Sequence, residues 1–222
     1  MEPIKDLLQQ YKLTYGNICP GTLLALRMVV LGCALLGIED PRGVDRDKLV
    51  VWVEIDRWLA DAVEAVTGVR LGKRTLKFLD YGKLAATFLN RETGKAVRIV
   101  ALESSRRLAD LRHPEIEDKY ERQMQAYREA AEEELFGIYD VEVHVRAKDL
   151  PGHPRSRVTC QKCGEGVNDG REISLPDNIR LCRSCIYGTY YTHNSADTKR
   201  YGRATVAVSA RGAGDGIKPA VA

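Results

Sequence analysis

The spacing of hydrophobic residues along the chain switches between a helical and a strand period. Apolar residues recur three or four positions apart in three segments, which predicts helices over residues 2–13, 22–36 and 57–66. Segments rich in β-branched and aromatic residues predict strands over residues 48–55, 75–79, 85–90, 96–102 and 140–147. Residues 91–95, with Gly94, have the length of a hairpin loop. The pattern therefore predicts an α+β fold with a mixed helix and sheet domain.

A longer amphipathic pattern covers residues 114–136 and predicts one long, charged helix. Its apolar positions draw a single narrow stripe made of Ile116, Tyr120, Met124, Tyr127, Ala131 and Leu135. Such a stripe either packs on the body of the protein or contacts a second copy of the chain. The second alternative makes the protein a homodimer.

The most apolar run, residues 23–38, predicts a buried helix rather than a membrane span. It is 16 residues long and contains Arg27, whereas a span needs about 20 predominantly apolar residues. Residues 1–10 also lack the basic and then apolar pattern of a signal peptide. We therefore expect a cytoplasmic protein with no membrane partner.

Charge is distributed unevenly along the chain, although the formal net charge is only +3. Residues 1–150 carry 23 basic and 25 acidic side chains, whereas residues 151–203 carry 9 and 5. Two prolines and a glycine in residues 151–154 indicate a linker. We therefore predict a domain over residues 1–150, a small module over residues 151–203 and a disordered tail over residues 204–222.

Four of the six cysteines form two CxxC pairs, Cys160 with Cys163 and Cys182 with Cys185, separated by 18 residues. Two thiolates three residues apart on a tight turn can both bind one ion, and two such turns complete a tetrahedron. Four thiolates leave zinc no open position, so the spacing predicts one structural zinc site that helps to fold the module. An iron–sulfur cluster and a redox dithiol are the alternatives.

The cysteine module also interleaves basic and aromatic residues. They are Arg155, Arg157, Lys162, Arg171, Arg180, Arg183, Tyr187, Tyr190, Tyr191, His193, Lys199, Arg200 and Arg203. Such a surface can bind nucleic acid or a protein partner. In the alternative interpretation the tyrosines form the small core of the module and the arginines keep it soluble.

Cys19 stands apart from the other cysteines because it precedes Pro20 and Gly21 at the start of the apolar helix. Unpaired N–H groups at a helix start favour a thiolate, so Cys19 is a candidate nucleophile, metal ligand or redox centre. Cys33 lies within the apolar run and is expected to be a packing residue.

Several ordered motifs resemble the E-subunit family of formylmethanofuran dehydrogenase. They are Cys19-Pro20-Gly21 followed by Arg27 and Met28, residues 61–68 (DAVEAVTG), Gly72-Lys73, residues 80–83 (DYGK), residues 91–95 (RETGK) and the four-cysteine module. The resemblance covers about residues 12–190. It implies an α+β domain that is often dimeric, a pocket metal and a C-terminal zinc ribbon. It further implies an accessory component of a molybdenum or tungsten oxidoreductase that reduces carbon dioxide.

The chain departs from the family at the positions that would hold the pocket metal. The family pattern has histidines where this chain has Tyr15 and Asn17, and cysteines where it has Trp58 and Val69. Imidazole and thiolate hold transition metals, so we predict no second metal at Cys19.

Polar residues instead suggest a pocket for a polar or anionic small molecule. The candidate ligand pocket comprises Tyr15, Asn17, Cys19, Asp56 and Lys83. Asp61, Asp80 and Tyr81 can contribute to it, and all of these residues can equally serve turns and helix caps.

These observations favour a metal-binding accessory or small-ligand-binding protein with a structural zinc ribbon. One alternative is a zinc-ribbon regulator that binds nucleic acid or a protein partner through residues 155–203. A second is a redox or thiol enzyme that depends on Cys19. Catalysis has no further support, because no histidine lies near Cys19 in the sequence and no other catalytic motif is present.

Overall fold

The computed structural model describes residues 2–192 of the 222-residue chain. The chain divides into two compact units, one of residues 1–145 with 150–152 and the other of residues 146–149 with the chain from residue 153 onward. The expected tail and the last part of the cysteine module, residues 193–222, lie outside the described residues. No helix between residues 2 and 192 has both the length and the apolar character to cross a membrane.

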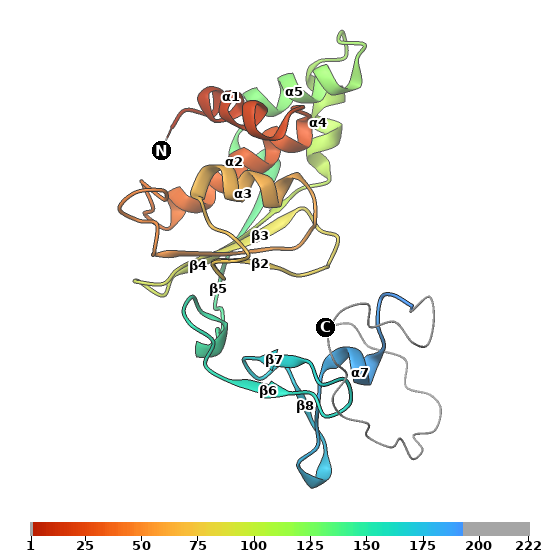
Figure 1. Ribbon diagram of the computed structural model, residues 1–222. Helices are drawn as coiled ribbons and strands as arrows, with labels where there is room; N and C mark the ends of the chain where they lie inside the picture. Colours follow the sequence, from red (N-terminus) through yellow and green to blue (C-terminus); the bar gives the residue numbers. More distant parts are fainter. Residues whose placement is uncertain (1, 193–222) are drawn as a thin grey trace. The chain divides into compact units, whose positions relative to one another are not determined.

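Unit 1 is built on a five-stranded mixed sheet (Figure 1). Its strands are β1 (Leu49–Val53), β2 (Leu76–Phe78), β3 (Ala85–Asn90), β4 (Ala96–Ala101) and β5 (Phe136–Val141), in the spatial order β2-β1-β3-β4-β5. The pair β1 and β2 is parallel, and the other neighbours are antiparallel. A β1–α3–β2 connection therefore lies at one edge of the sheet.

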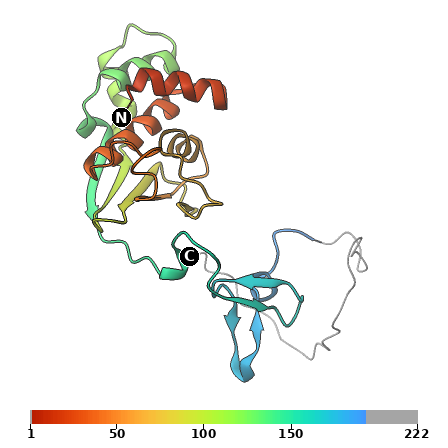
Figure 2. The same cartoon turned by 60° about the vertical axis from the view of Figure 1, so that its left-hand side comes forward.

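Helices cover one face of this sheet, as both views of the chain show (Figures 1 and 2). They are α1 (Ile4–Tyr15), α2 (Pro20–Leu35), α3 (Trp58–Thr67), α4 (Ser104–Arg112), α5 (Lys119–Glu129) and the single turn α6 (Glu132–Leu135). The expected α+β class is confirmed. The core lies between α2 and the sheet, because α2 is buried along almost its whole length and packs on β3 and β4.

Two residues of α2, a glycine and an arginine, make specific contacts with neighbouring elements. Gly32 lets the helix approach the sheet so closely that a Cβ atom there would lie 2.6 Å from the Phe88 ring. The Arg27 guanidinium donates to the Glu132 carboxylate at 2.6 Å and to the Tyr127 carbonyl oxygen. The apolar run is therefore a buried helix, and its one charged side chain is paired.

Glycine ends two of the helices as the sequence indicates. Gly37, after α2, and Gly68, after α3, have φ values of 65° and 70°, in the left-handed region that glycine adopts without strain. The hairpin between β3 and β4 is also confirmed, and Gly94 in its loop has φ 75°.

The single long helix expected over residues 114–136 is wrong. Pro114 disfavours helical backbone at His113, which has φ −132° and ends α4. Helix α5 begins only after Asp118, whose carboxylate accepts a hydrogen bond from the Glu121 amide at 2.7 Å. It ends before Ala130, which is extended. The apolar spacing runs through these breaks, and helix α4 itself was not predicted.

The strand expected over residues 140–147 is also displaced. The chain becomes extended at Phe136 and pairs with β4 as far as Val141, with Ile138 opposite Ile99. Pairing of β5 with a strand about 40 positions earlier in the sequence decides where the helical segment ends. The alternation of apolar and polar residues over 140–147 therefore does not show where the strand begins.

Unit 2 contains short elements around the cysteines. They are the 3₁₀ turns η1 (Ala147–Asp149) and η2 (Pro176–Asn178), the strands β6 (Arg157–Thr159), β7 (Gly166–Asn168), β8 (Ile173–Ser174) and β9 (Arg180–Leu181), and helix α7 (Arg183–Tyr187). Strand β6 pairs with β7, and β8 pairs with β9. Within the described part of this unit, the only buried residues are Cys160, Asp169 and Cys182.

Candidate metal centre and ligand cavity

The four cysteines of unit 2 converge on one point. Their sulfur atoms all lie within 4.8 Å of one another, and the Sγ atoms of Cys163 and Cys182 are 3.8 Å apart. Four sulfurs at about 2.3 Å from a central zinc ion in a tetrahedron are about 3.8 Å apart. This group can hold one metal ion, whereas a multi-iron cluster would push the sulfurs further apart.

Each CxxC pair lies on a turn that directs its sulfurs inward. In the first turn, between β6 and β7, the Gly164 amide donates to the Cys160 carbonyl oxygen at 2.8 Å, and Gly164 has φ 76°. In the second, at the start of α7, whose N-cap residue is Cys182, the Cys185 amide donates to the Cys182 carbonyl oxygen at 3.1 Å. Short turns of this kind place both sulfurs of a pair on one side.

Backbone amides around Cys160 favour its thiolate form. Burial alone would raise the pKa of this thiol, but N–H groups of Cys163, Cys182 and Lys162 face the sulfur and lower its pKa to about 6. The Cys182 amide donates to the Cys160 sulfur at 3.2 Å. Thiolates are the form that binds metal, so Cys160 is prepared for a cation, whereas burial raises the pKa of Cys163 and Cys185.

In unit 1, Cys19 is the N-cap residue of α2 and lies in a separate polar cluster. Its Sγ and its backbone amide are each 3.4 Å from the Thr22 hydroxyl oxygen. The Tyr11 and Tyr15 rings stack with centroids 4.8 Å apart. Burial and the nearby Asp61 carboxylate raise the pKa of Tyr11 to about 12. We name Tyr11, Tyr15, Cys19, Thr22 and Asp61 the Cys19 cluster.

Trp58 packs against the turn that begins α2. A Cβ atom added to Gly21 would lie 3.1 Å from the Trp58 ring and 3.6 Å from the Cys19 sulfur. The position where the family pattern has a cysteine is therefore close to Cys19, and here an indole occupies it. Val69, at the other such position, is buried in the core.

A cavity of about 470 Å³ lies beside Trp58, at the carboxyl ends of the parallel strands β1 and β2. Val53 and Phe78, the last residues of the two strands, are paired in register, and both line it. The complete lining is Val53, Ile55, Asp56, Arg57, Trp58, Ala60, Asp61, Leu71, Leu76 and Phe78. Ligands commonly bind outside the carboxyl ends of parallel strands, so we treat this Trp58 cavity as the candidate ligand site.

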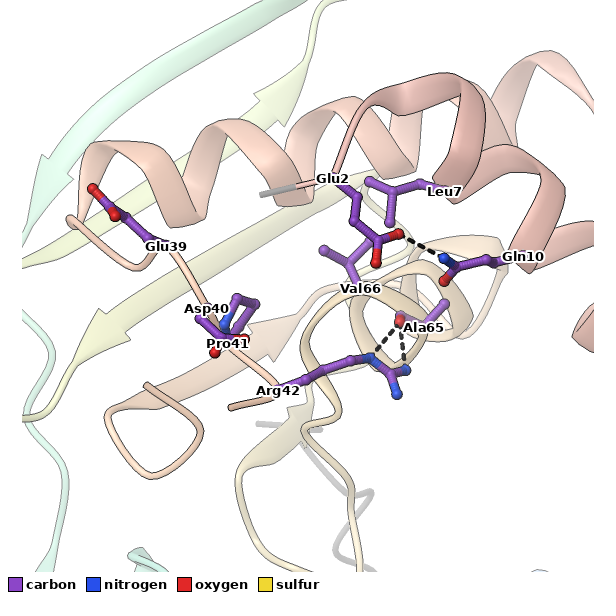
Figure 3. A pocket seen from close by; sticks show the side chains of 9 residues that line it. All are labelled: Glu2, Leu7, Gln10, Glu39, Asp40, Pro41, Arg42, Ala65 and Val66. Carbon is purple, nitrogen blue, oxygen red and sulfur yellow. Dashed lines mark hydrogen bonds between the residues drawn. The ribbon is translucent and has the colours of Figure 1, made fainter. Parts of the chain in front are cut away.

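A second cavity, of about 380 Å³, lies between α1, α3 and the loop after α2 (Figure 3). Three of its polar side chains, those of Glu2, Asp40 and Arg42, already have partners. Arg42 donates to the Ala65 carbonyl oxygen at 2.9 Å, and Glu2 accepts from Gln10 at 2.6 Å. The Asp40 carboxylate accepts from the amides of its own turn. We assign these groups to structure.

The structure separates the residues proposed for the ligand pocket. Asp56 lines the Trp58 cavity, whereas Tyr15, Asn17, Cys19 and Lys83 line neither of the two cavities. Tyr15 and Cys19 belong to the Cys19 cluster. Asn17 is exposed, and the Lys83 ammonium lies 5.9 Å from the centroid of the Tyr81 ring.

Sequence reasoning missed most of the cavity. It noted Trp58 only as a lost metal ligand and Asp61 only as a supporting polar residue, and it did not identify Arg57 or Phe78. The spacing of Trp58 and Asp61, three apart on α3, places both side chains on one helix face. This spacing is the one feature of the sequence that could have indicated that Trp58 and Asp61 lie side by side.

The tyrosines in the described part of unit 2 are exposed. Tyr187, Tyr190 and Tyr191 have 56%, 100% and 45% of their surface accessible, so the interpretation that they form the core of the module is wrong. Arg180 and Arg183 are exposed as well. These side chains are available to a partner.

Comparison with known proteins now defines the family. The family model described as FmdE, molybdenum formylmethanofuran dehydrogenase operon, matches residues 15–142, which is more than half of the chain. The chain belongs to the FmdE family. The matched segment contains most of the Cys19 cluster and the whole Trp58 cavity, whereas the four cysteines of unit 2 lie outside it.

Two relatives of this FmdE protein are informative. A probable S-adenosyl-L-methionine-binding protein of Archaeoglobus fulgidus is 30% identical over 206 residues, a match that covers 83% of this chain. The chain spans only about half of that relative, 53% of its length. A crystal structure of a tungsten formylmethanofuran dehydrogenase FmdE-like protein from Syntrophus aciditrophicus has the same fold. It has a TM-score of 0.56 at 24% identity, and the match covers 85% of this chain and 95% of the other.

Proposed function

We propose that this FmdE protein is an accessory, ligand-binding protein whose second unit carries a structural zinc ion. The observation that carries the proposal is the Trp58 cavity, which combines aromatic and carboxylate side chains at the ends of two parallel strands. The residues that bind the ligand are therefore different from most of those expected from the sequence. Cys19 is assigned to the start of α2, where it contacts Thr22.

We further propose that the ligand is S-adenosylmethionine or a closely related adenosyl compound. Support comes from the A. fulgidus relative, which is described as a probable S-adenosyl-L-methionine-binding protein. It also comes from the cavity, whose volume of about 470 Å³ is in the range usual for small-molecule sites. The half-exposed rings of Trp58 and Phe78 offer flat surfaces on which an adenine can stack.

Zinc is the proposed metal of the four-cysteine site. The sulfur–sulfur distances suit a single tetrahedral ion, and four thiolate ligands leave no position for a substrate. Cys160, Cys163, Cys182 and Cys185 would hold the ion, and its role would be to fold unit 2 rather than to react.

Titration with S-adenosylmethionine tests the ligand proposal. In a Trp52→Phe variant, Trp58 is the only tryptophan of the chain, so a bound adenine is expected to change the remaining fluorescence. Trp52 alternates with the core residues Val51 and Val53 and therefore faces away from the helices. Calorimetry should give the same affinity for wild type and Trp52→Phe.

The deciding variant is Trp58→Ala, which is expected to weaken binding by about 5- to 150-fold, because a base loses about 1–3 kcal/mol of stacking. Trp58 is 42% exposed, so its removal should leave the fold intact, as circular dichroism would verify. Absence of binding to wild type at millimolar ligand would refute the proposed function.

The remaining expectations stay predictions. We propose separate domains over residues 1–150 and 151–203, a homodimer, an oxidoreductase or other protein partner and a cytoplasmic location. Nucleic-acid binding by unit 2 is a second candidate function, favoured by the exposed Tyr187, Tyr190 and Tyr191. Such binding would weaken steeply as salt is raised.

A further inference from the structure

The charges that line the Trp58 cavity do not balance. Asp56 and Asp61 supply two carboxylates and Arg57 one guanidinium, which lies 5.8 Å from the centroid of the Trp58 ring. Within residues 2–192, neither carboxylate forms an ion pair with a protein side chain. The lining therefore offers a net negative charge to whatever enters it.

The two carboxylates differ in how firmly they are held. Asp56 is exposed in the loop between β1 and α3. Asp61 is half-buried in the first turn of α3, three residues after Trp58. Burial and the neighbouring Glu64 carboxylate raise the pKa of Asp61, and hydrogen bonding with Tyr11 opposes that rise. Tyr11, which is 1% exposed, therefore connects Asp61 to the core.

Helix packing does not explain the charge of Asp61. The N-cap residue of α3 is Arg57, and no side chain caps the helix start, so neither aspartate serves as a cap. A carboxylate in a first turn interacts favourably with the helix dipole, but that effect does not require it to border a cavity beside an indole ring. The arrangement of Trp58 next to Asp61 is suited to a flat group that carries a positive charge close by.

We propose that Asp61 makes the Trp58 cavity selective for a cationic adenosyl ligand, so that the protein binds S-adenosylmethionine in preference to S-adenosylhomocysteine. The inference rests on the proposed function and adds to it a preference between two related ligands. The two compounds share adenine, ribose and amino acid parts, but the first is a sulfonium with one additional positive charge and the second is a neutral thioether. Both compounds carry an ammonium group in the amino acid part, so a carboxylate distinguishes them only where it lies near the sulfur, and there only the sulfonium gains from it.

The sign of the charge favours a cationic ligand over the anionic one that the sequence left open. The candidate set from the sequence included Lys83, which lines neither cavity. The structure brings two aspartates and a single arginine to the cavity instead. Arg57 is the group that can pair with the carboxylate of the ligand's amino acid part.

Calorimetric titration of the full chain with each compound tests the inference without any substitution. Wild type is expected to bind S-adenosylmethionine at least about tenfold more tightly than S-adenosylhomocysteine, a ratio typical of one added charge pair in a partly exposed site. Equal affinities would overturn the selectivity and leave the proposed function standing. Failure of both compounds to bind would overturn both.

Substitutions then assign the selectivity to Asp61. Asp61→Asn is expected to reduce the preference to about twofold or less by weakening binding of the sulfonium alone, because the added charge pair is lost. Asp61→Glu should retain most of it. Asp140→Asn, an exposed aspartate on β5, is the matched control and should leave both affinities unchanged. Should Asp61→Asn fail to fold, Tyr11→Phe removes the hydrogen bond and should reduce the preference in part. A preference that survives in a folded Asp61→Asn would refute the assignment.

Discussion

Cys19 and Cys160 have the same side chain but different neighbours. Cys160 has three other sulfurs within 4.8 Å and an amide donor at 3.2 Å, and it is 1% exposed. Cys19 has the Thr22 hydroxyl at 3.4 Å, and the two aromatic residues Tyr15 and Trp58 stand at positions where the family pattern has metal ligands. We therefore expect no transition-metal site at Cys19.

Metal analysis of purified protein should separate the two cysteines. Wild type and Cys19→Ser are expected to contain about one zinc per chain, whereas Cys160→Ser should lose it, because three sulfurs no longer close the tetrahedron. Elemental analysis by mass spectrometry measures both zinc and iron. A second metal equivalent that persists in Cys160→Ser and vanishes in Cys19→Ser would show that unit 1 binds metal.

Gly32 shows how packing between elements overrides the preference of a single helix. Replacing a glycine within a helix by alanine ordinarily stabilises the helix by about 0.5–1 kcal/mol. At position 32, however, the new methyl group would lie 2.6 Å from Cδ2 of the Phe88 ring in β3. Helix and sheet would have to separate, and overpacking of this kind costs about 1–3 kcal/mol.

Gly32→Ala is therefore expected to lower the free energy of unfolding, opposite to the helix-propensity effect. Urea denaturation of the full chain followed by the circular dichroism of unit 1 measures the change. The double variant Gly32→Ala/Phe88→Leu should recover part of the loss, because the smaller side chain makes room for the methyl group. A Gly32→Ala protein more stable than wild type would contradict the close contact.

The two units differ in what holds them together. Unit 1 has a continuous core between its helices and its sheet. In the described part of unit 2, Cys160 and Cys182 are the only buried residues of hydrophobic type. So small an apolar core does not offset the conformational entropy lost on folding, and we expect metal binding to supply the missing free energy.

Removal of the metal with a strong chelator should consequently unfold unit 2 and spare unit 1. Hydrogen–deuterium exchange followed by mass spectrometry is expected to show loss of protection in β6, β7, β9 and α7. Protection in α2 and β3 should be unchanged, and added zinc should restore the lost protection. Loss of protection in both units together would indicate that unit 1 also depends on the metal.

Local sequence patterns predicted those elements whose conformation is decided by the residues of the element itself. The strands predicted over 85–90 and 96–102, observed as β3 and β4, the hairpin between them and the glycines that end α2 and α3 follow from propensity and from backbone conformations open to glycine. The interruption of the long helix expected over residues 114–136 could not be predicted from the local pattern. The apolar stripe continues past Pro114, and pairing of β5 with β4 determines where the strand begins.

The sequence by itself determined the four-cysteine cluster and the family, because CxxC turns and ordered motifs are local and their geometry is set within a few residues. Only the tertiary structure decided which polar side chains share a cavity. Val53, Trp58, Asp61 and Phe78 come from three elements, and the parallel pairing of β1 with β2 brings them together. The charged residues of the lining, Asp56, Arg57 and Asp61, all lie within residues 56–61, but that they border a cavity with Leu76 and Phe78 of β2 depends on this pairing.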